Sequence, residues 1–395
     1  GTAVEALQRR LDRRQVRRRI AWSAGVVAGV AIVVLGLSAS VLGKWLERVG
    51  PRLVGLVSAV CWGGGFVLGG FGIISGQLWL LYLGYGVLGG IGLGAGYITP
   101  VSTLVRWFPD RRGMATGIAI MGFGGGAMIA KFMVDPLVTF FYRAPQYLGT
   151  EAAVDLVTKA GRRFAEVGGE LKEVVVVGAN DVADMIVPGA EGVYVVGTGT
   201  VGVAQTFMAL GVVYFVIMVL AAFSYRVPPN DWKPEGFTPK KSAGMVTSHV
   251  VHVDQALKTP QFYQLWIVLC FNVAAGIGVL AVAKTMMKEI FGTTLPGMVD
   301  AEFAATYVLM ISLFNLLGRF GWASVSDYIG RKMTYNVFFG LGIALYVSIP
   351  IMAAQVSVTP SVVYLVGFSA VTMLIFTMYG GGFATIPAYI ADLFG

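Results

Sequence analysis

Residues 310–332 of this 395-residue chain read MISLFNLLGRFGWASVSDYIGRK. The stretch closes an apolar run over 303–325 and then turns into a short charged loop, SDYIGRK. About 20 consecutive apolar residues are enough for a helix to cross the hydrocarbon core of a bilayer. The stretch therefore predicts a membrane-spanning helix that ends at a charged connector, with one arginine, Arg319, inside the apolar part.

The same pattern recurs along the whole chain. Hydrophobic residues make up 56% and charged residues 13%, with a mean hydropathy of +0.75, whereas soluble domains carry about 25% charged residues. The composition argues against a soluble enzyme. Nine apolar blocks of bilayer length stand at 20–42, 53–76, 78–105, 114–132, 201–225, 262–283, 303–325, 333–354 and 362–389. With 54 glycines that allow close helix packing, they predict an all-α polytopic membrane protein.

The net charge of +8 is explained by the connectors between these blocks. The connectors 43–52, 106–112, 226–260 and 326–332 are basic or long and hydrophilic, and by counting spans all four lie on one face. Positive connectors mark the cytoplasmic face, so we expect a multi-pass protein of the plasma (inner) membrane, with the lipid bilayer and not nucleic acid as its partner. Residues 1–19 carry seven arginines and yet fall on the outer face, which contradicts this orientation.

Two connectors look like copies of one device, because GKWLERVGP at 43–51 and GWASVSDYIGRK at 321–332 share an acid, a base and a glycine turn. Six spans separate them, which predicts two six-helix halves of a twelve-helix protein, with the first helix and the last two absent from this chain. The predicted organisation is a basic extramembrane segment (1–19), N-terminal half helices (20–141), an extracytoplasmic insert (142–200), the last helix of that half (201–225), a cytoplasmic linker (226–260) and C-terminal half helices (261–395).

The insert is predicted to be a small folded unit outside the membrane. Its residues 150–173 favour a helix, and EVVVV and GVYVV, at 173–177 and 192–196, favour strands. Gly197, Gly199 and Gly202 then form a G-x-G-x-x-G pattern. No acid follows before Asp231 and the next helix is apolar all round, so we interpret the pattern as a flexible start of a span and not as a nucleotide site.

No cofactor or metal is predicted. His249 and His252 lie in the polar linker and are interpreted as solvated. Cys61 and Cys270 lie within apolar blocks and are expected to be core thiols, since no disulfide framework or cysteine-based metal site is indicated.

Arg319 is the clearest candidate for a binding residue, because charges within the membrane are costly and usually functional. Its position seven residues before the charged loop leaves snorkelling as an alternative. Asn315 lies one turn earlier on the same face. A guanidinium pairs with a carboxylate through two parallel hydrogen bonds, which indicates a small organic anion. Tyr97, Tyr379 and Phe383 stand among glycines, either as walls of a cavity or in ordinary packing.

Four segments give the chain a family resemblance: GKWLERVGPR (43–52), WFPDRRGMATGIAIMGFGGG (107–126), LGRFGWASVSDYIGRK (317–332) and YGGGFATIPAYIADLFG (379–395). The chain resembles the major facilitator superfamily, specifically its oxalate/formate antiporter branch and the related monocarboxylate transporters. The resemblance implies two pseudo-symmetric six-helix halves, a substrate near the midplane and alternating access.

The resemblance also implies roles for single residues. Arg319 would bind the substrate carboxylate beside Asn315, and the aromatic residues named above would wall the site. The repeated loop would gate the cytoplasmic side through Glu47, Arg48 and Arg52 in one half and Asp327, Arg331 and Lys332 in the other. A second cation that the family carries in helix 11 would lie beyond Gly395.

The predicted function is secondary active transport of small organic carboxylates such as lactate, formate or oxalate. Either a proton or a counter-anion would be the coupling partner, giving symport or anion exchange. A facilitator for another solute, such as a sugar or a drug, is the first alternative. A membrane sensor that uses the insert as its ligand domain is the second, and no catalytic cluster near a membrane face supports an enzyme.

Overall fold

The computed structural model describes residues 2–159, 161–182, 187, 189–229, 232–236 and 251–395. In this part of the chain nine helical spans are long and apolar enough to cross a membrane, and each coincides with one of the nine predicted blocks, so the prediction of an all-α membrane protein is confirmed. The spans are Gly25–Val49, Pro51–Ile74, Leu78–Trp107, Arg112–Phe141, Val203–Ser224, Pro260–Phe291, Glu302–Ile329, Arg331–Val358 and Val362–Phe394.

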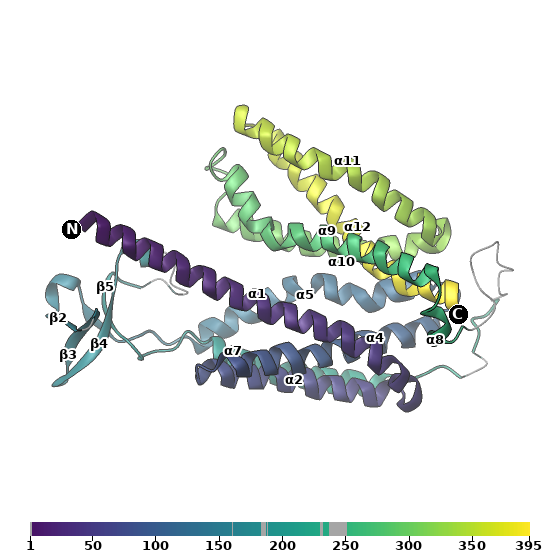
Figure 1. Ribbon diagram of the computed structural model, residues 1–395, viewed down its shortest axis with the longest axis horizontal. Helices are drawn as coiled ribbons and strands as arrows, with labels where there is room; N and C mark the ends of the chain where they lie inside the picture. Colours follow the sequence, from purple (N-terminus) through teal and green to yellow (C-terminus); the bar gives the residue numbers. More distant parts are fainter. Residues whose placement is uncertain (1, 160, 183–186, 188, 230–231, 237–250) are drawn as a thin grey trace. The chain divides into compact units, whose positions relative to one another are not determined.

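The helices that carry these spans are shown in Figure 1. The first span is the end of a longer helix, α1 (Thr2–Val49). The third consists of α3 (Leu78–Leu81), a π-helical segment (Tyr82–Leu88) and α4 (Gly89–Trp107). The others are α2 (Pro51–Ile74), α5 (Arg112–Phe141), α7 (Val203–Ser224), α9 (Pro260–Phe291), α10 (Ala301–Ile329), α11 (Arg331–Val358) and α12 (Val362–Phe394).

Contacts divide the chain into two compact units. The first contains Gly1–Gly96 and Phe132–Ser224, and the second contains Tyr97–Lys131 and Tyr225–Gly395. The second unit therefore holds the end of α4 and the first part of α5 together with α9 to α12. All the residues predicted to bind a substrate belong to this second unit.

In the first unit, α4 and the π-helical segment before it pack against two neighbours through glycines. Gly86, Gly90 and Gly94, spaced by four, face α1, whereas Gly92 and Gly96 face α2. The approach is so close that a Cβ atom on Gly90 would lie 2.9 Å from the Ala31 carbonyl oxygen, and one on Gly92 would lie 2.6 Å from the Trp62 nitrogen. Small residues on membrane helices allow such backbone contact, where no hydrophobic drive between helices exists.

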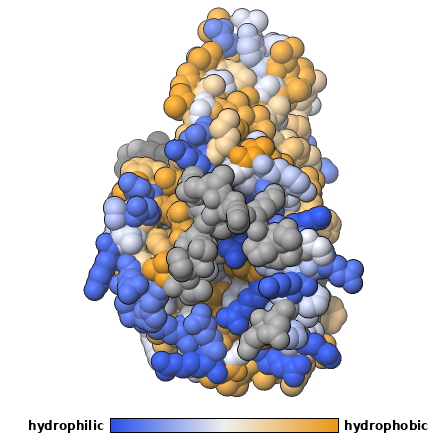
Figure 2. All heavy atoms as spheres, turned by 90° about the vertical axis from the view of Figure 1, so that its right-hand side faces the viewer, coloured by the Kyte–Doolittle hydropathy of each residue, from blue (hydrophilic) through white to orange (hydrophobic). Residues whose placement is uncertain are grey.

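The two connectors that the sequence suggests are copies share one backbone conformation. Gly50, between α1 and α2, has φ 83° and ψ 166°. Gly330, between α10 and α11, has φ 87° and ψ 151°. This region of the backbone map is open essentially only to glycine, so each turn reverses the chain within a single residue. Figure 2 views the helix ends, where hydrophilic side chains gather.

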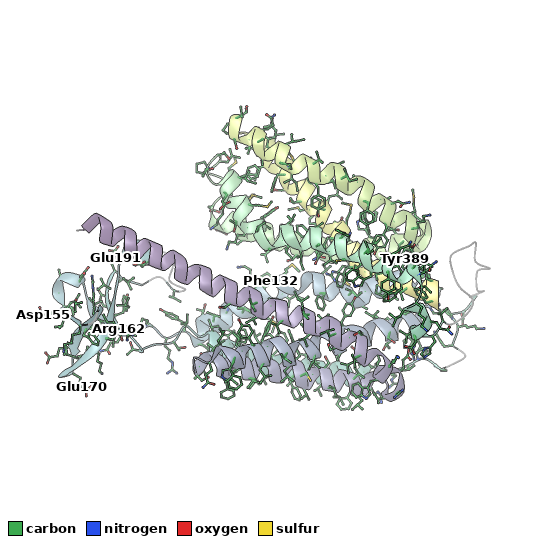
Figure 3. All side chains as sticks on the ribbon, in the orientation of Figure 1. Phe132, Asp155, Arg162, Glu170, Glu191 and Tyr389 are labelled. Carbon is green, nitrogen blue, oxygen red and sulfur yellow. The ribbon has the colours of Figure 1, made fainter. Side chains whose placement is uncertain are left out.

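The insert is a five-stranded antiparallel sheet in the order β1-β5-β4-β3-β2. Its strands are β1 (Tyr147–Gly149), β2 (Leu156–Lys159), β3 (Arg162–Val167), β4 (Glu170–Val177) and β5 (Gly192–Val195). Its small core holds Ala165, Val174, Val193 and Val195. Charged residues such as Asp155, Arg162 and Glu170 are spread over the rest of it (Figure 3).

The predicted helix over 150–173 is wrong, whereas both predicted strands are confirmed within β4 and β5. Gly168 and Gly169 both have positive φ, 64° and 86°, and form a two-residue turn between the paired residues Val167 and Glu170. A Gly-Gly turn of this kind is a strong hairpin signal. It overrides the helix preference of the alanines, glutamates and lysines around it.

The G-x-G-x-x-G pattern forms the tight return from the insert to α7. Gly197, Gly199 and Gly202 all have positive φ, between 76° and 80°. A Cβ on Gly202 would lie 2.6 Å from the Val138 carbonyl oxygen, so the chain passes against the end of α5. Beside this return, Arg143 and Thr200 exchange two backbone hydrogen bonds of 2.9 Å, so the two ends of the insert meet.

The predicted linker histidines and core cysteines give mixed results. His249 lies outside the described residues, and His252 is exposed, where its Nδ1 accepts a 3.3 Å hydrogen bond from the Asp254 N–H at the start of the short helix α8 (Val253–Ala256). Cys61 is half-buried, but Cys270 is exposed on α9. The expectation of a core thiol is therefore wrong for Cys270, which lies on the exposed side of α9 with Trp266 and Phe271.

Candidate functional site

Arg319 lies in α10 with 3% of its surface exposed. Its Nε donates a 3.2 Å hydrogen bond to Oδ1 of Asn315, one turn earlier. Its Nη1 donates a 3.3 Å hydrogen bond to the carbonyl oxygen of Ile120 on α5. The guanidinium thus points toward α5 and away from the charged turn, which argues against the snorkelling alternative.

Two aromatic rings flank this guanidinium. Its central carbon lies 5.1 Å from the centre of the Phe383 ring and 5.9 Å from that of Phe123. The Tyr97 ring stands edge-on to both, with centres 6.0 Å from Phe123 and 6.1 Å from Phe383. Cation–π contacts at a desolvated site contribute about 2 kcal/mol, so the rings stabilise the charge without neutralising it.

Tyr97 and Phe383 occupy equivalent places in a short repeated pattern. The first copy reads GYITP at 96–100, and the second reads GFATIP at 382–387. Each is a glycine, an aromatic residue, a fully buried threonine two positions on, and then a proline. Pro387 lacks the N–H that would bond the Phe383 carbonyl, so each proline loosens the helix beside the site. The aromatic residues of the two copies, Tyr97 and Phe383, are in contact.

Glycines of α12 bring that helix against α10 and α9 at the same level. A Cβ on Gly380 would lie 2.5 Å from Oδ1 of Asn315, and one on Gly382 would lie 2.5 Å from Oδ1 of Asn272 on α9. Tyr379 is 8% exposed, packs on Gly276 of α9 and lies within electrostatic range of Arg319. The predicted binding residues therefore converge on one place.

A second polar cluster lies where α10 ends and α11 begins. The Asp327 carboxylate accepts 2.8 Å hydrogen bonds from the backbone N–H groups of Gly113 and Met114 at the start of α5. A carboxylate is favoured at a helix N-terminus, where N–H groups are unpaired. The acid of the second charged connector thus fastens α10 to α5.

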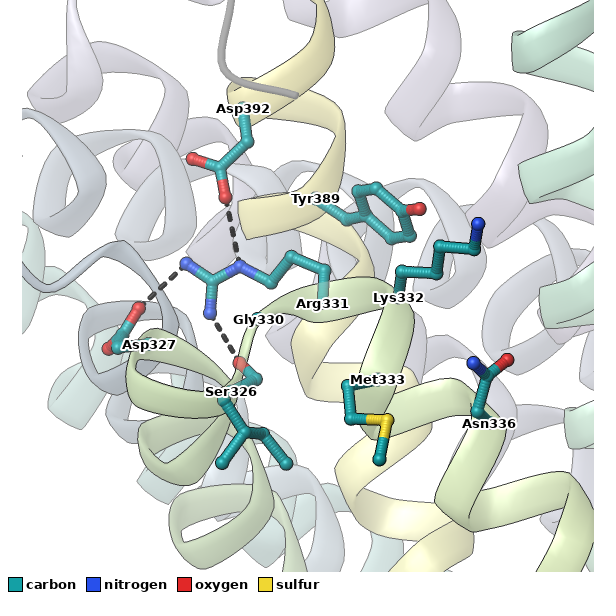
Figure 4. Close-up of a pocket in the computed structure, with 10 residues that line it drawn as sticks. Ser326, Asp327, Gly330, Arg331, Lys332, Met333, Asn336, Tyr389 and Asp392 are labelled. Atoms are coloured by element: carbon teal, nitrogen blue, oxygen red, sulfur yellow. Dashed lines mark hydrogen bonds and ion pairs between the residues drawn. The ribbon is translucent and has the colours of Figure 1, made fainter. Parts of the chain in front are cut away.

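Arg331 is the centre of this cluster (Figure 4). It donates to Asp327 from Nη2 at 2.6 Å, to Asp392 from Nε at 2.9 Å and to the hydroxyl of Ser326 from Nη1. Asp392, near the end of α12, also lies 3.4 Å from Nη1 of Arg112. Four chain segments are therefore joined through two arginines and two carboxylates.

The other predicted gating residues are exposed. Lys332 follows Arg331 but points away from the two carboxylates (Figure 4). In the first unit, Glu47, Arg48 and Arg52 are exposed beside the Gly50 turn. Their gating role stays a prediction.

Sequence reasoning missed Phe123 and Asp392. The criterion that selected Tyr97, an aromatic residue among glycines, also fits Phe123 in GFGGG (122–126). Asp392 is an acid directly after a span. Nothing in its local sequence indicates that Arg331, 61 residues earlier, is its partner.

Nine apolar spans in the described chain, a buried arginine among aromatic rings and a charge network at helix ends define a polytopic membrane carrier. The chain belongs to the Major Facilitator Superfamily, whose family description matches residues 19–147 and 176–395. It is accordingly a transporter and a multi-pass membrane protein, and not an enzyme.

Individual relatives agree with this assignment. The chain is 25% identical over 377 residues to the uncharacterized MFS-type transporter YhjX of Escherichia coli, covering 95% of this chain and 72% of that protein. It is 27% identical over 358 residues to the oxalate:formate antiporter of Oxalobacter formigenes, covering 89% of this chain but only 64% of the antiporter. The crystal structure of the transporter FucP in its outward conformation has the same fold, with a TM-score of 0.51 at 12% identity, over 93% of this chain and 80% of FucP.

Proposed function

We propose that this transporter carries small organic carboxylates, either monocarboxylates such as lactate or formate, or oxalate, by alternating access. The observation that carries the proposal is which of the buried arginines has a carboxylate as counter-charge. Among the described residues, Arg319 and Arg331 are the buried charged ones. Arg331 is paired with two carboxylates. Arg319 contacts no carboxylate in that part of the chain.

A buried charge without a counter-charge is costly, because desolvation is not repaid by an ion pair. The Arg319 site therefore suits an anion that binds reversibly and supplies the missing counter-charge. A carboxylate fits, since the Nη2 atom of Arg319 has no hydrogen-bond partner among the described residues and a guanidinium donates paired hydrogen bonds to a planar anion. The similarity to an oxalate:formate antiporter supports the same class of substrate.

The coupling is either anion exchange or proton symport. In both, the cluster of Asp327, Arg331 and Asp392 would hold the cytoplasmic ends of α5, α10 and α12 together in one state and release them in the other. Glu47, Arg48 and Arg52 would act in the same way in the other half.

The test is uptake of labelled formate, lactate and oxalate by proteoliposomes, with either internal counter-anion or an imposed pH gradient. We expect Arg319→Ala to abolish uptake while the protein stays folded. Arg162→Ala, the same change on the exposed insert, is the matched control and should keep wild-type uptake. Wild-type uptake by Arg319→Ala would contradict the proposal. Dependence on counter-anion or on the gradient separates exchange from symport.

A further inference from the structure

A pocket of about 470 Å³ opens beside the Arg331 cluster, between the turn from α10 to α11 and the end of α12 (Figure 4). This volume is within the range of about 300–1,000 Å³ that small-molecule sites occupy. The pocket is distinct from the Arg319 site, because Arg319 lies eight residues before Asp327, about 12 Å along α10. Neither the proposed transport of carboxylates nor the charge cluster assigns it a ligand.

The charges at the pocket sum to one positive charge once Arg112, which pairs with Asp392, is counted with the lining: three cations, Arg112, Arg331 and Lys332, stand beside two carboxylates, Asp327 and Asp392. Asp327 and Asp392 line it, but both carboxylates accept hydrogen bonds from Arg331, through its Nη2 and Nε, while its Nη1 donates to the hydroxyl of Ser326. Lys332 also lines the pocket and makes no ion pair with any described residue. An anion is therefore the ligand that this lining favours.

Two neutral donors stand on the same side of the pocket as the Lys332 ammonium. Tyr389 and Asn336 line the pocket together with Lys332, and Figure 4 shows all three side chains on the side away from the Asp327 and Asp392 carboxylates. Neither group makes a hydrogen bond with another residue in the described chain. Three separate donors on flexible side chains suit the several oxygens of a phosphate, for which lysine acts as a point charge, better than a flat carboxylate, which favours a guanidinium fork.

We propose that this pocket binds a phosphate group, through Lys332, Tyr389 and Asn336. The group is either the headgroup phosphate of a phospholipid in the adjacent leaflet or free inorganic phosphate. The face is the one predicted to be cytoplasmic, where basic pockets between membrane helices bind anionic headgroups.

The test uses the whole chain and reads binding, so its outcome does not depend on whether carboxylates are transported. Purified protein in detergent is titrated with inorganic phosphate against chloride of equal ionic strength, and the thermal unfolding midpoint is followed, since a ligand of the native state raises it. The same protein in nanodiscs of phosphatidylcholine, with or without phosphatidylglycerol, is examined by native mass spectrometry for bound phospholipid.

We expect Lys332→Gln to weaken phosphate or phospholipid binding roughly tenfold or more, the contribution of one hydrogen bond to a charged group. Tyr389→Phe, which keeps the ring, should weaken it less. The matched control is Lys288→Gln, which removes the same charge from the last turn of α9 and should bind like wild type. A response to phosphate alone identifies free phosphate, and a response to phosphatidylglycerol identifies the headgroup. No saturable response to either, or equal losses in Lys332→Gln and Lys288→Gln, would overturn the proposal.

Discussion

The guanidinium of Arg319 is stabilised by one amide oxygen, one backbone carbonyl and two aromatic faces. None of these partners carries a negative charge. This combination keeps the cation in place while leaving its charge for a substrate, and it contrasts with Arg331, whose charge is used entirely within the protein.

The first expectation at this scale concerns the ring closest to the charge. Phe383→Leu keeps an apolar side chain but removes the cation–π contact, worth about 0.5–2 kcal/mol. We therefore expect the half-saturation concentration for anion uptake to rise by about two- to thirtyfold. Phe140→Leu, at a ring 79% exposed on α5, is the control. Equal affinities in the two variants would show that the Phe383 ring contributes nothing to binding.

A second expectation follows from the fact that Arg331 is paired with carboxylates and Arg319 is not. Arg319→Gln removes a buried charge without a counter-charge, so the thermal unfolding midpoint should stay equal or rise. Asp392→Asn leaves Arg331 with one carboxylate, so unfolding should become easier by about 1–3 kcal/mol. Thermal unfolding of both variants in the same detergent shows whether each unfolding midpoint rises or falls relative to that of the wild type. A lower midpoint for Arg319→Gln would contradict the absence of a counter-charge at this site.

At the scale of elements, the turns at Gly50 and Gly330 are the clearest internal repeat. Both reverse the chain between two membrane helices with φ near 85°. The acid, the base and the glycine of each connector therefore start from the same backbone geometry, although the charge network described above is built around the second copy.

We expect Gly330→Ala to destabilise the protein by about 1–3 kcal/mol, because alanine is strained in this conformation. Gly340→Ala, inside α11 where a Cβ atom would meet nothing within 4 Å, should stabilise it by about 0.5–1 kcal/mol. The thermal unfolding midpoints of the two variants measure this pair of effects. Similar midpoints would mean that the turn tolerates a different backbone path.

The elements differ in how far sequence predicts them. The nine spans are predictable because bilayer thickness fixes their length and composition, independently of their partners. The hairpins of the insert are predictable only by giving the Gly168–Gly169 pair more weight than the surrounding helix formers. At the site, Arg319 can be predicted from the sequence because it is a charged residue within an apolar run. Phe123 also has a local signal, since it stands among glycines, whereas Asp392 acquires its role only from its contact with Arg331 of α11, which no local pattern contains.

At the scale of the whole molecule, the insert is attached as a separate module. Its ends are brought together by the paired hydrogen bonds of Arg143 and Thr200. Its hydrophobic core consists of residues from its own strands. The insert therefore connects α5 and α7 through chain ends that already lie side by side at Arg143 and Thr200.

We expect replacement of residues 144–199 by a short glycine-containing turn to leave anion uptake largely unchanged. The reason is that Arg143 and Thr200, which would flank the new turn, are already hydrogen-bonded to each other. The measurement is uptake by proteoliposomes normalised to folded protein. If the chain were instead a membrane sensor that uses the insert as its ligand domain, the same replacement should abolish its response to the ligand. Loss of uptake in a folded variant would favour a working role for the insert.

The glycine contacts of α4 reverse a familiar rule of protein engineering. In most interiors an added methyl group is extra apolar surface to bury, and hydropathy scales score it as a gain. At Gly90 and Gly92 the space for that methyl is already taken by the backbone of α1 and α2, at 2.9 and 2.6 Å. The freedom of this helix to change is therefore limited by excluded volume, and an alanine that makes the segment more membrane-like by composition would push its neighbours apart.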